Sequence, residues 1–395
     1  MDSKARIGIV GAGSMGLGIA EVAARAGHPV VIWDAFPQQE KSMELVRKHL
    51  LKTIEKTGQG QDWVDQVLAH FLWVKDIEAM PDCFLIVEAV PEDLALKNEV
   101  FARLEAGQPQ TCIFATNTSS LSVAALSGKL KHPERFLGLH FFNPAFLMPL
   151  VEVVPGVATR PGLSEDMAEL MRNWGKIPVM AKDTPGFIVN RVARPFYGES
   201  IRILEEGLAD ATEIDTTLKE KAGFKMGPFE LMDFIGHDVN FTVTETVFKA
   251  FWFDPRYKPS FTQQRLTEAG RLGRKSGRGF YDYSSSAPLP QALPDEPTQV
   301  LILNRVLPML MNEAIDALHL GIASASDLDL AMTKGVNYPK GLLHWADEWG
   351  APRVLKAMEA LFEEYGEDRY RPSPLLRKAA REGFNFTSYE RNRTS

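Results

Sequence analysis

The sequence predicts a doubly wound α/β domain followed by two all-α domains that are related by internal duplication. Three observations predict it. Short apolar, strand-like runs alternate with helical patterns up to about residue 180, the strand-like runs stop after Lys182 to Gly186, and motifs of the helical segment that follows recur further along. We therefore expect an α/β domain over 1–182, a helical domain over 183–283, a linker over 284–298 and a second helical domain over 299–395.

The first elements form a strand, a glycine turn, a helix and a second strand. Ile7 to Val10 is an apolar run typical of a buried strand, and a helical pattern runs from near Met15 to Ala26. Val30 to Trp33 reads as the next strand, after Gly27 and Pro29 end the helix. This order is a βαβ unit, which predicts a parallel sheet.

Further strands are expected after a mostly helical segment over 37–76. They cover Cys83 to Val90, Cys112 to Ala115, Phe136 to Phe142, and Leu150 to Val154. Four prolines in the fourteen residues 284–297 exclude a continuous helix there and predict the linker.

The two helical segments repeat one another without gaps. The pairs are Asn190 with Asn304, Glu199 with Glu313, Gly207 with Gly321, Asp215 with Asp329, Gly227 with Gly341, Asp233 with Asp347, and Gly236 with Gly350. Each pair is 114 positions apart (304 − 190, 350 − 236). A constant offset over this length indicates a duplicated helical module.

Composition excludes several classes of protein. The 395 residues carry a net charge of −7, which gives no electrostatic reason to expect a nucleic-acid or membrane partner, and no apolar run is long enough to span a membrane. Cys83 and Cys112 are the only cysteines, so neither a disulfide framework nor a cysteine-based metal site is indicated. With the first strand beginning at Ile7, no signal peptide is expected, and a cytoplasmic protein without a metal is predicted.

A glycine-rich turn follows the first strand and opens the first helix. It consists of Gly11, Ala12, Gly13, Ser14, Met15 and Gly16. Asp34 ends the next strand, 18 positions after Gly16 (34 − 16). In this context the turn predicts a Rossmann-type dinucleotide site, with the pyrophosphate at the helix N-terminus and the ribose on Asp34. NAD is favoured over NADP, because a 2′-phosphate would meet the charge of Asp34; a turn needed only for packing is the alternative.

Two titratable residues lie within later apolar runs. His140 lies in the run 136–142 and Glu152 in the run 149–155, twelve positions apart (152 − 140). Rigid, water-excluded positions of this kind suit a general base and a carboxylate that orients it. A hydrogen-bonded core histidine is the simpler alternative.

Polar residues at two other places are candidates for binding. Ser119 follows a strand, where ligands bind in open α/β sheets, although a helix N-cap is the other explanation. Asn190 begins the first helical module, and because Asn304 matches it in the second copy, it could also serve folding.

Together these motifs resemble the 3-hydroxyacyl-CoA dehydrogenase family over nearly the whole chain, including Asp183 to Arg191 and Leu272 to Tyr281. The resemblance implies that His140 is the general base, that Glu152 orients it, and that Ser119 and Asn190 hold the reacting oxygens. It further implies cofactor contacts from Glu92, Lys97, Asn143 and Lys275, and Lys52 is a possible contact to the CoA tail.

The function expected from this resemblance is NAD-dependent, reversible oxidation of an (S)-3-hydroxyacyl-CoA to the 3-oxoacyl-CoA, as in β-oxidation of fatty acids. Two alternatives remain: a dehydrogenase of a non-CoA 3-hydroxy acid or of a dicarboxyl or aromatic-pathway CoA ester, and a non-catalytic NAD-binding protein. A homodimer is possible, but the second helical copy could take the place of a partner subunit.

Overall fold

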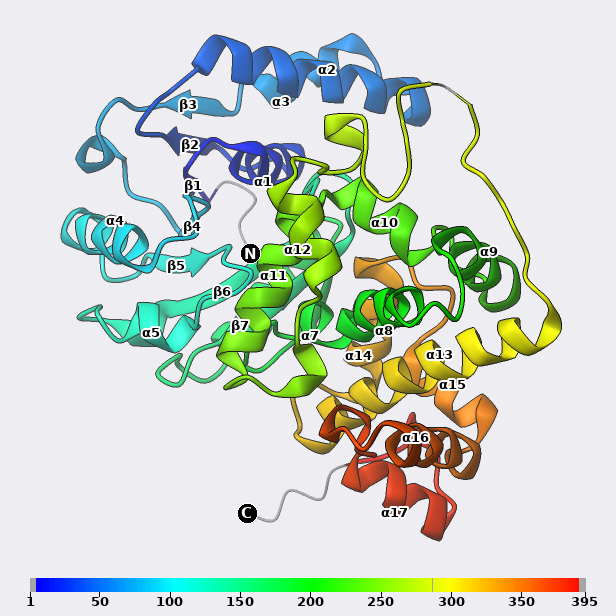
Figure 1. The fold of residues 1–395 in the computed structure, drawn as a ribbon. Coiled ribbons are helices and arrows are strands. Elements are labelled where there is room, and N and C mark those ends of the chain that lie inside the picture. Colours follow the sequence, from blue (N-terminus) through cyan, green and yellow to red (C-terminus); the bar gives the residue numbers. More distant parts are fainter. Residues whose placement is uncertain (1–4, 286, 391–395) are drawn as a thin grey trace. The chain divides into compact units, whose positions relative to one another are not determined.

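The computed structural model describes residues 5–285 and 287–390, and these form two compact units, one ending at Thr184 and the other beginning at Pro185 (Figure 1). The first unit ends two residues after residue 182, where the sequence predicted the end of the α/β domain. Both copies of the repeat lie in the second unit.

The first unit is built on an eight-stranded sheet with the order β3-β2-β1-β4-β5-β6-β7-β8. The strands are β1 Ile7–Val10, β2 Val30–Trp33, β3 Phe71–Trp73, β4 Leu85–Glu88, β5 Ile113–Thr116, β6 Phe136–Phe141, β7 Leu150–Pro155 and β8 Ile177–Met180. All neighbouring pairs are parallel except β6 and β7. The strand order reverses direction between β1 and β4, which is where open α/β sheets bind ligands.

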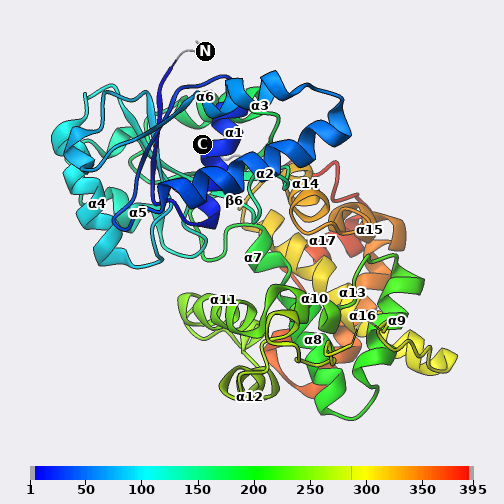
Figure 2. The same ribbon diagram turned by 90° about the horizontal axis from the view of Figure 1, so that it is seen from above.

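Helices cover both faces of this sheet. They are α1 Ser14–Arg25, α2 Gln39–Thr57, α3 Gln61–Leu68, α4 Leu94–Gly107, α5 Val123–Ser127 and α6 Leu163–Asn173. Helices α1, α3 and α6 share one side in Figure 2, where their apolar residues form a core with the strands, and α4 and α5 lie on the other side. On that second side Phe101 of α4 packs edge-on against Phe136 of β6, with ring centres 4.8 Å apart. The doubly wound architecture predicted from the sequence is confirmed.

Two strands were not predicted. The short strand β3 falls within the segment 37–76 that was assigned as helical, and Leu72 at its centre is half exposed, so no buried apolar run marks it. Strand β8 contains Pro178, which argues against a central strand. It is tolerated because β8 lies at the edge of the sheet.

The second unit is built mainly of helices. Its α-helices are α7 Val189–Val192, α8 Arg194–Glu205, α9 Ala211–Ala222, α10 Pro228–Ile235, α11 His237–Ala250, α12 Phe261–Glu268, α13 Glu296–His319, α14 Ala325–Gly335, α15 Leu342–Trp349, α16 Ala351–Tyr365 and α17 Pro374–Glu382. Helices α9, α10 and α11 begin 114 positions before α14, α15 and α16 (325 − 211, 342 − 228, 351 − 237). The spacing of the sequence motifs is therefore also the spacing of the helices.

The repeated aspartates hold equivalent turns in the two copies. Asp215 accepts hydrogen bonds from the backbone N–H groups of Phe229 and Glu230, and Asp329 accepts them from Leu343 and His344. The repeated glycines make room for these carboxylates, because a Cβ on Gly227 or Gly341 would lie about 2.3 Å or less from the Asp side chain. The aspartate–glycine pairs that reveal the repeat thus cap the start of α10 and α15.

Reciprocal ion pairs join the two copies. Glu313 of the second copy, fully buried, accepts hydrogen bonds from Arg191 Nε at 2.7 Å, Tyr257 Oη at 2.6 Å and Arg256 Nη1 at 3.1 Å, all from the first copy. Burial opposes ionisation of this carboxyl, but Arg191 and Arg256 lower the pKa of Glu313 to about 2.

The mirror arrangement surrounds Glu199 of the first copy. It accepts hydrogen bonds from Arg305 Nε at 3.0 Å and Tyr370 Oη at 2.9 Å of the second copy, and Arg369 lies 3.5 Å away. Arg305 is the repeat equivalent of Arg191, and Tyr370 follows Tyr257 by 113 positions (370 − 257). Each copy therefore presents the same surface to the other, which is the geometry of a two-fold dimer within one chain.

The predicted linker is shorter than expected. Helix α13 begins at Glu296, with Asp295 as its N-cap, so the helix starts before residue 298, where the linker was predicted to end. Pro297 does not prevent this, because proline is tolerated in the first helical turn. Ser286 of the linker, Met1 to Lys4 and the predicted end of the second helical domain beyond Glu390 lie outside the described residues.

Within residues 5–285 and 287–390, no helix has the length and apolar character needed to cross a membrane. Cys83 and Cys112 are buried free thiols.

Candidate active site

The glycine turn has the conformation and the space that a dinucleotide needs. Gly11 has φ of +97°, a value that favours glycine, and a Cβ on Gly16 would lie 1.8 Å from the carbonyl oxygen of Gly11. These two glycines are therefore required by the turn itself. Gly13 differs, because a Cβ there would meet no atom within 4 Å. The open space at Gly13, beside the N-terminus of α1, suits a pyrophosphate group.

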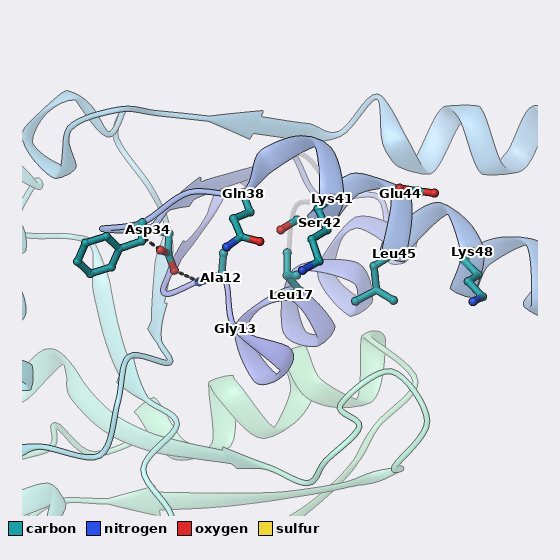
Figure 3. A pocket seen from close by; sticks show the side chains of 11 residues that line it. Ala12, Gly13, Leu17, Asp34, Gln38, Lys41, Ser42, Glu44, Leu45 and Lys48 are labelled. Atoms are coloured by element: carbon teal, nitrogen blue, oxygen red, sulfur yellow. Dashed lines mark hydrogen bonds between the residues drawn. The ribbon is translucent and has the colours of Figure 1, made fainter. Parts of the chain in front are cut away.

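Asp34 is tied to this turn from the end of β2. Its Oδ2 accepts a hydrogen bond from the N–H of Ala12 at 2.6 Å, and its Oδ1 accepts one from the N–H of Phe36 at 2.7 Å. Both bonds fix the carboxylate in the lining of a cavity of about 540 Å³ (Figure 3). The cavity is lined by Ala12, Gly13, Leu17, Asp34, Phe36, Gln38, Lys41, Ser42, Glu44, Leu45 and Lys48. A carboxylate at this place can accept hydrogen bonds from the hydroxyl groups of an adenosine ribose, so these residues fit NAD.

His140 and Glu152 are direct partners on neighbouring strands. The antiparallel register of β6 and β7 places them opposite one another, and His140 Nδ1 lies 2.6 Å from Glu152 Oε2. The histidine is 6% exposed and the glutamate is fully buried. A carboxylate accepts a hydrogen bond, so the proton of the neutral ring lies on Nδ1 and leaves Nε2 with a lone pair. The arrangement can therefore accept a proton at Nε2 and stabilise the imidazolium that results.

Glu92 and Lys97 organise the loop that carries Ser119. Glu92 Oε1 accepts hydrogen bonds from the N–H groups of Ser119 and Ser120 at 3.0 and 3.1 Å and from the Thr118 hydroxyl at 2.6 Å. Lys97 lies 3.3 Å from the other oxygen of Glu92. Burial would raise the pKa of Glu92, but Lys97 and these hydrogen bonds hold it below its ordinary value. The loop after β5 is thus held by a charged carboxylate.

Lys97 also pairs with Glu88 at the end of β4, at 2.6 Å. Burial raises the pKa of Glu88 despite this pair, and the Thr116 hydroxyl donates to its second oxygen. The lysine is 1% exposed, and it pairs with one buried carboxylate, Glu88, and one exposed carboxylate, Glu92.

Asn143 connects the histidine strand with the glycine turn. Its Oδ1 accepts a hydrogen bond from the Ser14 hydroxyl at 3.3 Å, and the bond between Asn143 and Pro144 is cis. Asn117, which the sequence did not single out, accepts a hydrogen bond from the N–H of Phe141. The structure therefore brings together two residues, Ser14 and Asn143, that were predicted separately as cofactor contacts.

The N-cap explanation for Ser119 is wrong. Helix α5 begins at Val123, and Ser122 caps it by accepting from the N–H of Ala125. Asp183 supplies a second acceptor to the N–H groups of Val123 and Ala124. Ser119 is therefore free of that structural task.

Two of the predicted residues belong to the second unit, and a third lies on α2. Asn190 and Lys275 belong to the second unit, where Asn190 is half-buried in α7 and Lys275 pairs with Asp238 at 2.5 Å. Lys52 is exposed on α2, and the lysines in the cavity lining are Lys41 and Lys48. The sequence did not distinguish among the lysines of α2, because all lie on one amphipathic helix.

Comparison with known proteins identifies the family. The NAD-binding domain of 3-hydroxyacyl-CoA dehydrogenase matches residues 6–184, and the C-terminal domain of the same family matches twice, over 186–283 and 301–388. A 3-hydroxyadipyl-CoA dehydrogenase from Escherichia coli is 38% identical, with 95% of this chain and 97% of the relative covered. The mitochondrial hydroxyacyl-coenzyme A dehydrogenase of Sus scrofa is also 38% identical, over 70% of this chain and 90% of its own length.

Solved structures agree. The crystal structure of a 3-hydroxybutyryl-CoA dehydrogenase from Escherichia coli superimposes with a TM-score of 0.91 at 36% identity, covering 96% of this chain and 98% of that one. The (S)-3-hydroxybutyryl-CoA dehydrogenase of Ralstonia eutropha gives a TM-score of 0.68 at 35% identity, covering 71% of this chain and all of that one. The chain belongs to the 3-hydroxyacyl-CoA dehydrogenase family and carries that family's NAD-binding domain.

Proposed function

We propose that this dehydrogenase oxidises the 3-hydroxyl group of a 3-hydroxyacyl-CoA ester, with His140 as general base and Glu152 as the carboxylate that orients it. The observation that carries the proposal is the 2.6 Å contact between His140 Nδ1 and Glu152 Oε2. Because Nδ1–H is engaged by Glu152, the lone pair on Nε2 takes the proton of the hydroxyl. NAD, held by the turn from Gly11 to Gly16 and by Asp34, would supply the acceptor for the hydride that leaves C3. The C3–O double bond forms as the proton leaves, giving the 3-oxoacyl-CoA and an imidazolium beside Glu152.

The remaining residues have positioning roles in this proposal. Gly11 to Gly16 and Asp34 bind the dinucleotide, and Glu92, Lys97, Asn143 and Lys275 contact it or hold the loops around it. Ser119 and Asn190 hydrogen-bond the reacting oxygens of the substrate. The phosphates of CoA would be attracted by Lys52, or by Lys41 and Lys48 in the cavity lining, because these lysines are exposed on α2.

A dicarboxyl ester is one substrate class that the relatives support. One Escherichia coli relative that covers nearly the whole chain is named for 3-hydroxyadipyl-CoA, whereas the Escherichia coli crystal structure of similar coverage and a shorter relative are named for 3-hydroxybutyryl-CoA. We therefore propose that 3-hydroxyadipyl-CoA and short 3-hydroxyacyl-CoA esters are both substrates.

The test is an absorbance assay of NADH formation with 3-hydroxybutyryl-, 3-hydroxyhexanoyl- and 3-hydroxyadipyl-CoA and with the corresponding free acids. Turnover limited to the CoA esters is the expected result. Turnover of the free acids at the same kcat/KM would contradict a CoA requirement, and NAD binding without turnover of any compound would favour a non-catalytic protein.

We also propose that the duplicated helical module replaces a partner subunit, since Glu199 and Glu313 each bind arginines of the other copy. A monomer in light scattering is expected, and a dimer that dissociates when either glutamate is replaced would contradict this proposal.

A further inference from the structure

The second unit buries one guanidinium without a carboxylate. Arg194, at the start of α8, is 6% exposed, and none of the described acidic residues pairs with it. Its Nη1 donates to the Thr244 hydroxyl at 3.0 Å, and its Cζ lies 4.9 Å from the centre of the Tyr197 ring. Its Nε has no hydrogen-bond partner among the described residues. An unpaired buried charge is costly to folding, so its retention calls for an explanation.

A second unsatisfied donor belongs to the same cluster. Over residues 5–285 and 287–390 the buried hydroxyl of Tyr338 has no hydrogen-bond partner. This hydroxyl and that of Tyr197 are the electrostatic neighbours of Arg194. Burial lowers the pKa of Arg194, and the two phenols oppose this shift without cancelling it. The cluster of Arg194, Tyr197, Thr244 and Tyr338 is therefore rich in donors and lacks an anion.

The duplication shows what the fold alone requires at these positions. The repeat equivalents, 114 positions away, are Pro308 for Arg194, Met311 for Tyr197, Met358 for Thr244 and Phe224 for Tyr338 (308 − 194, 338 − 224). All four equivalents are apolar, and all are buried. The equivalent packing site, in which the two copies exchange roles, is thus filled without charge, which indicates that the polar set around Arg194 serves binding.

The position of Arg194 relates it to the proposed substrate contact. Asn190 lies four residues earlier, and only Ala193, in a helical conformation, separates α7 from α8. Residues four apart on a helix share a face and are about 6 Å apart along its axis. In an extended acyl chain, three carbon–carbon bonds, roughly 4 Å, separate C3 from a carboxylate carbon at C6. The length of an arginine side chain can bridge the difference between these two distances.

We propose that Arg194 and Tyr338 form an anion site that binds the far carboxylate of a dicarboxyl acyl-CoA, and that this site sets the preference for such substrates. The proposal rests on the proposed function, in particular on Asn190 holding the substrate oxygen. Phosphate groups of the cofactor or of CoA share this anionic chemistry, and the experiment separates them from the carboxylate.

The measurement is kcat/KM for 3-hydroxyadipyl-CoA relative to 3-hydroxyhexanoyl-CoA, which has the same length but no carboxylate. Arg194→Met, which copies the apolar character of the second repeat, should lower this ratio by about 10- to 100-fold, the usual effect of losing a charged hydrogen bond. Tyr338→Phe, which copies Phe224, should lower it several-fold without lowering the melting temperature, because the hydroxyl has no partner in the fold. Arg353→Met removes an exposed charge from the second copy and should leave the ratio unchanged.

Calorimetry can also measure the affinity for adipyl-CoA and for hexanoyl-CoA, two esters that do not react, so this readout does not need turnover. An unchanged substrate ratio in Tyr338→Phe and in folded Arg194→Met would overturn the proposal, as would wild-type enzyme that oxidises the hexanoyl ester but not the adipyl ester. A loss shared equally by both substrates, with a raised KM for NAD or CoA ester, would assign the site to a phosphate instead. Wild-type enzyme inactive on every ester would refute the proposed function itself.

Discussion

Replacing Glu313 by Gln tests whether the reciprocal ion pairs hold the two helical copies together. The carboxylate is fully buried and accepts three hydrogen bonds, from Arg191, Arg256 and Tyr257. Its pKa falls from 4.5 to about 2, a difference that corresponds to about 3 kcal/mol of stability at neutral pH. Breaking a buried pair on one side costs about 3–5 kcal/mol, and Asp316, at 3.1 and 3.2 Å from the two arginines, limits the loss. We expect a loss of about 3 kcal/mol.

Urea unfolding, followed by circular dichroism at several pH values, measures this loss. Because the folded pKa lies below the unfolded one, the contribution of Glu313 is fully present above pH 4.5 and is lost as the pH falls towards 2. The difference between wild type and E313Q should therefore shrink in acid. E199Q provides the comparison: burial raises the pKa of Glu199, so its difference from wild type should not shrink in this way.

Glu359 pairs with Arg377 on the surface, and E359Q should cost less than about 1 kcal/mol. A loss below 1 kcal/mol for E313Q, equal to that of this surface control, would refute the role assigned to the buried pairs.

Four other substitutions probe the cofactor site and the repeat. Gly13→Ala should weaken NAD binding in calorimetry but leave the melting temperature unchanged, because the added Cβ meets no protein atom. Gly16→Ala should lower both the NAD affinity and the melting temperature, because its Cβ overlaps the Gly11 oxygen. Equal effects of the two substitutions would contradict this reasoning. Asp34→Ala should weaken NAD binding about 10-fold or more through the lost ribose contact, and unchanged affinity would place the ribose elsewhere. Burial raises the pKa of Asp215 to about 7, so its contribution to stability is fully present below pH 3.8 and is lost as the pH rises through 7. D215N should therefore reduce the change in unfolding free energy between pH 3.8 and 7. An unchanged pH dependence in D215N would contradict the raised pKa.

Much of the fold could be predicted because local signals were consistent. The strand bounds of Ile7–Val10 and Val30–Trp33 were predicted as observed, since short apolar runs between glycine and proline leave little choice. The duplication was visible because Asp215 and Gly227 must occur together, as must Asp329 and Gly341. The strand β8 was missed because its place at the sheet edge, which tolerates Pro178, is a tertiary property.

Contacts in the site depended on register and on long-range packing. His140 and Glu152 were both selected, but a shift of one residue between β6 and β7 would have pointed them to opposite faces, and the sequence does not encode the register locally. The same limit applies to Glu92, whose hydrogen bonds to Ser119 and Ser120 join residues more than 25 positions apart. The buried Arg194 was missed because only the structure shows that no carboxylate accompanies it.

The most direct test of the central claim compares His140→Asn and Glu152→Gln with the double variant under single-turnover conditions with saturating NAD and 3-hydroxyacyl-CoA. If His140 is the base and Glu152 acts through it, His140→Asn should slow hydride transfer by about 100-fold or more, and adding Glu152→Gln should slow it little further. NAD affinity and the melting temperature should change far less than the rate. An unchanged rate in His140→Asn, or effects of the two substitutions that simply multiply, would contradict the mechanism.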